Sequence, residues 1–147
     1  MARSRALHGD WVDPPADRTA CGAFLTQAAT QKQDVSLVWQ DDDFVGVVTL
    51  SEIIRGRLQQ AFMGFYAFAP LTGRGLMTQG VRLTLRRAFD DLGLHRVEAN
   101  VQPQNTRSLA LVQRAGFRKE GFSPRYLFIA GAWRDHERWA ALADDAG

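Results

Sequence analysis

The run of residues 65–78, FYAFAPLTGRGLMT, constrains the fold more than any other part of the chain. An aromatic, apolar segment stops at Pro70, two glycines follow at positions 73 and 75, and an amphipathic pattern begins directly after them. This order predicts a strand, a tight turn and a helix. The free backbone N–H groups of the turn and of the first helical turn then point the same way, at the positive end of the helix dipole. The stretch therefore predicts a site for an anion such as a phosphate ester.

The common nucleotide-binding motifs do not fit this stretch. A dinucleotide fingerprint needs a third glycine at position 78, which is Thr, and no Lys-Ser or Lys-Thr pair follows as a P-loop requires. An ordinary glycine turn between a strand and a helix therefore stays open as an alternative to an anion site.

The composition restricts the class of protein. With 147 residues, of which 46% are hydrophobic and 23% charged, the chain fits a single domain over residues 1–147 with one buried core. No apolar run has the length of a membrane span and no signal-peptide core follows the first residues, so we expect a cytoplasmic protein without a membrane partner. A formal net charge of +2 without a basic block gives no reason to expect a nucleic-acid partner.

Metal binding and cysteine chemistry find no support in the sequence. Three histidines and the single Cys21 are widely scattered, so we predict no metal site. Cys21 has no neighbouring His and fits a small core residue better than a nucleophile. The acidic run 41–43 lacks the glycine and the further ligands of a calcium loop, and we interpret it as a solvated hairpin tip.

The first part of the chain alternates between irregular, helical and extended patterns. The elements expected there are an irregular arm (1–15), a helix (15–31), the two strands of a hairpin (35–39 and 44–50), a linker (51–59) and a central strand (60–68).

A strongly amphipathic helix is expected after the glycine turn, over residues 77–92. Its apolar positions repeat at intervals of three and four, and its other side carries Arg and Asp. Gly93 is expected to end it.

The next expected strand, 95–102, alternates sharply between apolar and polar residues. Its polar face carries Arg96, Glu98, Asn100 and Gln102. A strand that follows a crossover helix is expected to lie parallel to the strand before it, in the interior of the sheet. A polar face in that place predicts either a cleft or a buried ionic network.

The last part of the chain predicts a short helix and a hairpin. Asn105 or Thr106 can cap a helix that runs to Ala115 and is closed by Gly116. Strands are expected over 117–129 and 132–141, with a turn at 130–131. The spacing of Trp133, His136 and Trp139 indicates hairpin packing.

Several ordered motifs resemble the GNAT acyl-CoA N-acyltransferases. They are FAPLTGRGLM (68–77), HRVE (95–98), PQNTRS (103–108), AGFRKEG (115–121) and GAWRD (131–135). Within that superfamily the chain is most similar to the branch of ribosomal-protein-alanine N-acetyltransferases, and the likeness runs from about Ser4 to Leu142.

The resemblance implies acetyl-CoA as the cofactor. Its pyrophosphate would bind the glycine turn, through the backbone around Leu71, Thr72, Gly73, Arg74, Gly75, Leu76 and Met77, with a hydroxyl added by Thr78. Asn105 matches an asparagine that contacts the pantetheine arm, and Ser108 lies in the same motif. The strand that ends near Phe68 and Ala69 matches one that splays from its neighbour, so that pantetheine pairs with its backbone and an amide N–H polarises the thioester carbonyl.

Three departures from the family pattern bear on catalysis. Many members place a tyrosine acid where this chain has Val112, which leaves Ser108, matched to a serine with that role in some relatives. Some relatives carry a glutamate base where this chain has Leu127, next to Tyr126. The family also begins with a strand and a helix ahead of the equivalent of residues 5–11, so the first strand is expected to be missing or shortened.

The reaction needs a neutral amine, a polarised carbonyl and a leaving thiolate. For the general base the sequence offers Glu52, which fits a surface carboxylate equally well, and Tyr126, which fits a pocket wall. Glu98 fits an ion pair with Arg96 better than a base. Ser108, the expected acid, has the alternative of bonding helix backbone.

The sequence and the resemblance together predict an α+β domain, layered α/β/α, with a mixed, mostly antiparallel sheet of about six strands flanked by helices. The expected reaction is acetyl transfer from acetyl-CoA to a primary amine, with a protein N-terminal α-amine as the acceptor. A small-molecule amine, or a non-catalytic acyl-CoA-binding module, is the alternative. We also expect a homodimer, because the shortened sheet would leave an open edge and because Trp11, Trp133 and Trp139 look exposed.

Overall fold

The computed structural model describes residues 33–68 and 75–145. The expected arm of residues 1–15, the helix 15–31, Cys21 and Trp11 lie outside the described residues. So do residues 69–74, which make up most of the glycine turn.

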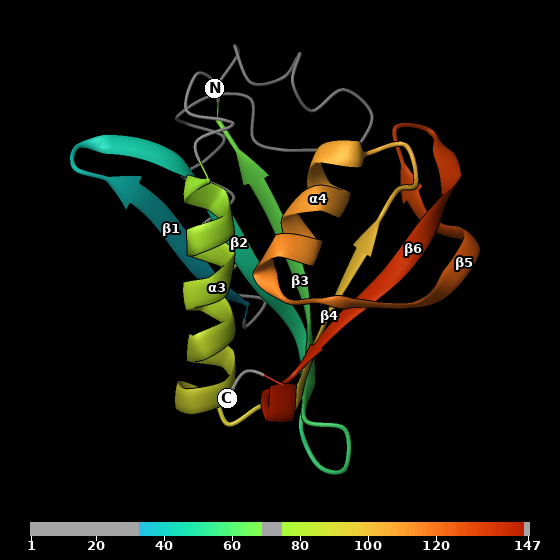
Figure 1. Ribbon diagram of the computed structural model, residues 1–147. Coiled ribbons are helices and arrows are strands. Elements are labelled where there is room, and N and C mark those ends of the chain that lie inside the picture. Colours follow the sequence, from blue (N-terminus) through green and yellow to red (C-terminus); the bar gives the residue numbers. More distant parts are fainter. Residues whose placement is uncertain (1–32, 69–74, 146–147) are drawn as a thin grey trace.

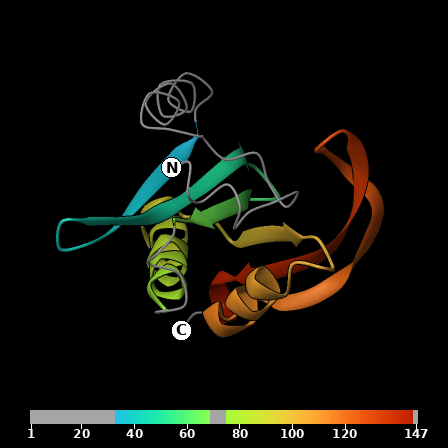
Figure 2. The same cartoon turned by 90° about the horizontal axis from the view of Figure 1, so that it is seen from above.

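Six strands form one mixed sheet, as predicted (Figure 1). They are β1 (Asp34–Gln40), β2 (Asp43–Ile54), β3 (Gln60–Ala67), β4 (Arg96–Val101), β5 (Arg118–Ile129) and β6 (Ala132–Leu142), in the order β1-β2-β3-β4-β6-β5. The β3–β4 pair is parallel and the other pairs are antiparallel. Helices α3 (Leu76–Arg86) and α4 (Thr106–Ala115) both lie against one face of this sheet (Figure 2).

The helix expected over 77–92 is present and begins one residue earlier. Gly75 is its N-cap and has a left-handed backbone, with φ 73°, a conformation that glycine adopts at little cost. After Arg86 the helix widens into a π-helical segment, η1 (Arg87–Asp91), which Leu92 closes by donating to the Arg87 carbonyl. A short 3₁₀ turn, η2 (Ala143–Asp145), follows the last strand.

The core lies between the helices and the sheet. Val81 and Leu85 of α3 and Val112 of α4 pack against the apolar residues of β2, β3 and β4. At Gly46 on β2 the helix comes so close that an added Cβ would lie 2.6 Å from the Met77 sulfur and 2.5 Å from the Tyr66 carbonyl oxygen. This contact fixes the start of α3 against the sheet.

Two expectations about this part of the fold were wrong. Residues 51–54 belong to β2 and not to a linker, because β3 supplies partners for them: Ser51 pairs with Phe62 and Ile54 with Gln60. The register shifts between them, at Glu52, which has φ 51°. Trp139 is also not exposed: it packs in the core at 6% exposure, whereas Trp133 is 61% exposed as expected.

The parallel joint between β3 and β4 is short. It consists of three pairs, Gln60–Arg96, Ala61–Val97 and Phe62–Glu98. Beyond them β3 continues beside β2, and β4 continues beside β6. The two strands therefore part like the sides of a wedge, which opens toward their C-terminal ends (Figure 1).

Candidate active site

A cavity of about 410 Å³ fills the wedge between β3 and β4. It receives side chains from β2, β3, β4, β5, β6 and α4. Among the lining residues are Glu52, Phe62, Asn100, Asn105, Ser108, Tyr126 and His136. The structure thus brings the three residues expected to be catalytic, Glu52, Ser108 and Tyr126, into one cavity.

The first turn of α4 forms one wall of this cavity. Asn105 is the N-cap, and its side-chain oxygen accepts a hydrogen bond from the Ser108 N–H at 3.2 Å. This is a standard capping geometry, and it leaves the Asn105 amide nitrogen as a donor. No residue in the described part of the chain bonds the Ser108 hydroxyl, so the alternative that this hydroxyl only bonds helix backbone finds no support.

Beyond Phe62, no described strand pairs with the β3 edge that faces the wedge. The Phe68 N–H donates to the Val45 carbonyl at 2.9 Å, so it points toward β2 and away from the cavity. Because successive residues of a strand point their N–H groups to opposite neighbours, the groups of Phe65 and Ala67 face the side that β4 has left. An amide N–H of β3 that polarises a thioester carbonyl in the wedge would therefore belong to Phe65 or Ala67 and not to Phe68.

The start of α3 is the described part of the expected phosphate site. Met77 and Thr78, in the first turn of this helix, are both buried. The first turn of α3 carries no acidic residue, which suits an anion at this end of the helix dipole. The other expected phosphate contacts, Leu71, Thr72, Gly73 and Arg74, and also Ala69, lie outside the described residues.

The polar face of β4 proves to be an ionic network at one end and a cleft at the other, so both alternatives hold. Arg96 donates to Gln60 Oε1 at 3.1 Å, to Glu98 Oε1 at 2.8 Å and to both carboxylate oxygens of Glu120. Bonds to Glu120 raise the pKa of Arg96 above its ordinary value and lower the pKa of Glu120. The network therefore fastens β3, β4 and β5 together at the closed end of the wedge.

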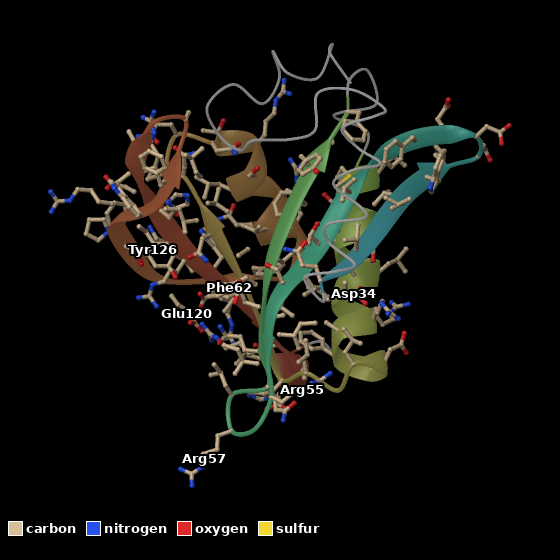
Figure 3. The ribbon with its side chains drawn as sticks, turned by 180° about the vertical axis from the view of Figure 1, so that it is seen from behind. Asp34, Arg55, Arg57, Phe62, Glu120 and Tyr126 are labelled. Carbon is tan, nitrogen blue, oxygen red and sulfur yellow. The ribbon has the colours of Figure 1, made fainter. Side chains whose placement is uncertain are left out.

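Figure 3 looks onto the face of the sheet that α3 and α4 do not cover. Phe62, Glu120 and Tyr126 all lie on this face. Further along β4 the same polar row reaches the cavity with Asn100 and Gln102. The Asn100 side-chain oxygen is buried and has no hydrogen-bond partner among the described residues.

The sequence did not point to His136 as a site residue. Its ring is 2% exposed, lines the cavity and meets the ring of Tyr126 edge-on, with centroids 6.2 Å apart. Burial lowers the pKa of His136 below its ordinary value, although Arg134 and Asp135 act in the opposite direction. In the sequence, the spacing of His136 was interpreted as hairpin packing. The structure shows that its ring also lines the cavity.

Two other expectations concern absent features. Within residues 33–68 and 75–145, no group of three or more His, Cys, Asp or Glu side chains is arranged to hold a metal ion. In the same ranges, no helix is both long enough and apolar enough to cross a membrane.

Comparison with known sequences places this geometry in a family. The model of the acetyltransferase (GNAT) domain matches residues 2–118. A probable N-acetyltransferase of Bacillus subtilis, YjcK, is 45% identical over 105 residues, which are 71% of this chain and 58% of the relative. The [ribosomal protein uS5]-alanine N-acetyltransferase of Escherichia coli is 34% identical over 105 residues, 71% of this chain and 54% of the relative. The chain thus spans somewhat more than half the length of these relatives.

A solved structure has the same fold over nearly the whole chain. Mycobacterium smegmatis RimJ, in complex with CoA-disulfide, superposes with a TM-score of 0.87 at 29% identity and covers 96% of this chain and 73% of its own. The ribosomal-protein-S5-alanine acetyltransferase of Vibrio fischeri gives 0.82 at 26% identity, covering 99% of this chain and 85% of its own. With the wedge, the helix start beside it and these matches, the chain belongs to the GNAT acetyltransferase family.

Proposed function

We propose that this protein transfers an acetyl group from acetyl-CoA to a primary amine, and that the amine is the N-terminal α-amine of a protein. The observation that carries the proposal is the wedge: a cavity entered between two strands, with the backbone edge of β3 on one side and the start of α4 on the other. The likeness to a uS5-alanine N-acetyltransferase supports the choice of acceptor.

The residues of the wedge fit a coenzyme A arm. The open edge at Phe65 and Ala67 offers backbone groups for an amide-bearing chain such as pantetheine, and Asn105 adds a side-chain donor. The backbone around residues 71–77 would hold the pyrophosphate. When bound, acetyl-CoA supplies an activated thioester. The residues of the site then position the amine and transfer protons.

The pKa of the acceptor favours an α-amine over a lysine amine. An α-amine has a pKa near ~8, whereas a lysine amine is nearer ~10.4 and needs a stronger base. Glu52 and Tyr126 are candidates to take the amine proton, directly or through water. Ser108 is the candidate to protonate the departing thiolate, since its hydroxyl lies on the cavity wall.

The two alternatives have weaker support. A polyamine acceptor would call for several carboxylates, and among the described lining residues Glu52 is the one carboxylate. The spermidine acetyltransferase of Vibrio cholerae, at 19% identity and a TM-score of 0.79, shares the fold. A non-catalytic module would be favoured by the missing tyrosine acid, and the Val112 side chain is indeed fully buried, but Ser108 offers a hydroxyl one turn earlier on α4.

We further propose that the protein works in the cytoplasm as a homodimer. Trp133 and Phe128, about 60% exposed, contact each other with tilted rings, centroids 5.4 Å apart, at the end of the β5–β6 hairpin. Such an exposed aromatic pair beside an edge strand suits a partner surface. Sedimentation at micromolar concentration should give a dimer, and a species of 16.4 kDa alone would contradict it.

A screen of acceptors tests the proposed function. Purified protein and acetyl-CoA are mixed with alanine-starting peptides, peptides with a blocked N-terminus and a free lysine, and polyamines, and the released thiol is measured. Acetylation of the free N-terminus, located by mass spectrometry, is the expected result. Preferred acetylation of polyamines or lysine would move the function to another acceptor. Tight acetyl-CoA binding without transfer to any amine would indicate a binding module.

A further inference from the structure

The buried His136 has a fixed tautomer. Its Nδ1 lies 2.9 Å from the carbonyl oxygen of Arg134. A carbonyl oxygen only accepts hydrogen bonds, so Nδ1 carries the proton and Nε2 keeps its lone pair. The backbone of β6 thus holds the ring with a basic nitrogen at its far end.

That basic nitrogen is available to a ligand. The ring lines the cavity, and no described residue bonds Nε2. The ring is also kept neutral near pH 7, because burial lowers its pKa. The charged or titratable side chains near it are Tyr126 on β5, Glu52 on β2, and Asp135 and Arg138 on β6.

A second unmatched acceptor lies on the same face of the sheet. Asn100 stands opposite Arg138 in the β4–β6 ladder, and His136 is two residues from Arg138 along β6. Such diagonal neighbours are roughly 7–8 Å apart, which lets both side chains reach one small group. The buried Asn100 Oδ1 has no partner among the described residues. Two acceptors without donors are complementary to an amine, which brings N–H donors.

We propose that His136 is a catalytic residue: its Nε2 accepts the proton of the acceptor amine while Asn100 Oδ1 holds the same amine. This inference rests on the proposed acetyl transfer. In the step, the amine nitrogen forms a bond to the acyl carbon, the carbon–sulfur bond breaks, and the amine proton passes to Nε2. The imidazolium then releases this proton to solvent, and the thiolate takes a proton from water or from Ser108, which solvent then reprotonates.

His136→Asn is the most informative variant. The Asn amide can still donate to the Arg134 carbonyl in place of Nδ1–H, but it carries no base. We expect kcat/KM for an alanine-starting peptide to fall about 100-fold or more, with acetyl-CoA affinity and thermal midpoint close to the wild type. His95→Asn is the matched control, because His95 is exposed and does not line the cavity, and it should behave as the wild type.

The pH profile separates a base from a structural residue. Below the pKa of the amine, log kcat/KM of the wild type should fall with a slope of one as pH decreases, and with a slope of two below the pKa of His136. In His136→Asn the second bend should disappear. Added imidazole should restore part of the activity of His136→Ala. A wild-type profile in His136→Asn, or a loss of activity explained by unfolding with no rescue by imidazole, would overturn the inference.

Nuclear magnetic resonance of the imidazole nitrogens gives a readout that needs no turnover. The enzyme without ligand should show His136 protonated at Nδ1, and an alanine-starting peptide should shift the Nε2 signal. A proton on Nε2, or an Nε2 signal that the peptide leaves unchanged, would refute the role of His136 even if the wild type acetylates amines. A wild type that acetylates no amine would instead refute the proposed function, and this inference with it.

Discussion

Replacing Arg96 tests whether the ionic network holds the wedge closed at its narrow end. In Arg96→Met the stem is kept and the charge is lost, so Glu98, which is 8% exposed, keeps a buried carboxylate without its partner. Removing one member of a buried pair costs about 3–5 kcal/mol. Glu120 adds at most ~1 kcal/mol, because its side chain is 36% exposed. We expect Arg96→Met to lose about 3–4 kcal/mol of unfolding free energy in total. This is near the lower end of the range for a buried pair, because the Glu98 side chain keeps a tenth of its surface in contact with solvent.

Thermal and denaturant unfolding would measure this loss. For a chain of this size a change of 1 kcal/mol moves the melting midpoint by about 2–4 °C, so Arg96→Met should melt roughly 6–16 °C below the wild type. Arg118→Met is a suitable control on β5, because Arg118 forms an ion pair with Asp145 while 68% exposed, and such pairs contribute about 0–1 kcal/mol. Adding Glu98→Gln to Arg96→Met should recover a large part of the loss, because it removes the unpaired charge.

The pH dependence gives a second check on the same variant. Arg96 lowers the pKa of Glu120 below its ordinary value of 4.5, so this contribution to stability is fully present above pH 4.5 and is lost as the pH falls through the lower folded-state value. The difference in unfolding free energy between wild type and Arg96→Met should therefore stay constant at neutral pH and become smaller below about pH 4.5. A loss under 1 kcal/mol, or no recovery in the double variant, would refute the account of the network.

Two further predictions concern the cofactor side. Gly75→Val should weaken acetyl-CoA binding by at least about tenfold in calorimetry while the protein stays folded, because a side chain at φ 73° strains the start of α3 although space for it exists; unchanged affinity would remove the phosphate site from this turn. Ser108→Ala should lower kcat more than it raises the KM for acetyl-CoA; a loss of cofactor affinity alone would make Ser108 a binding residue, and no effect would make it structural.

Local patterns predicted the elements of the fold well. The glycine at position 75 and the apolar spacing after it predicted the start of α3 to within a residue, and Asn105 predicted the start of α4. The prediction of a linker over residues 51–59 was wrong, because its first residues by themselves do not distinguish a strand from a loop. They become strand through partners on β3, which the local sequence does not contain.

The site was only partly within reach of the sequence. Ser108 was named through the family resemblance, Tyr126 because it stands beside Leu127, and Glu52 from its place after a strand, and the structure brings all three to one cavity. The row Arg96, Glu98, Asn100 and Gln102 was recognised as polar, but its division into a network and a cleft depends on where β3 leaves β4. His136 was missed for the same reason, since a histidine on a hairpin strand looks like packing until a cavity is found beside it.

The three-pair joint between β3 and β4 also bears on how the protein folds. Strands β1 to β3 are neighbours in the chain and pair in succession, and so do β5 and β6, whereas the joint connects residues 36 positions apart. Loop closure must be completed before such contacts form. We expect the β1–β2–β3 and β5–β6 pairs to acquire their hydrogen bonds first, and the joint and the β4–β6 pairs, whose residues lie 36 to 46 positions apart, to acquire theirs afterwards. The cleft would then be the last part of the fold to form, and its amides should exchange with solvent before those of the β1–β2 hairpin.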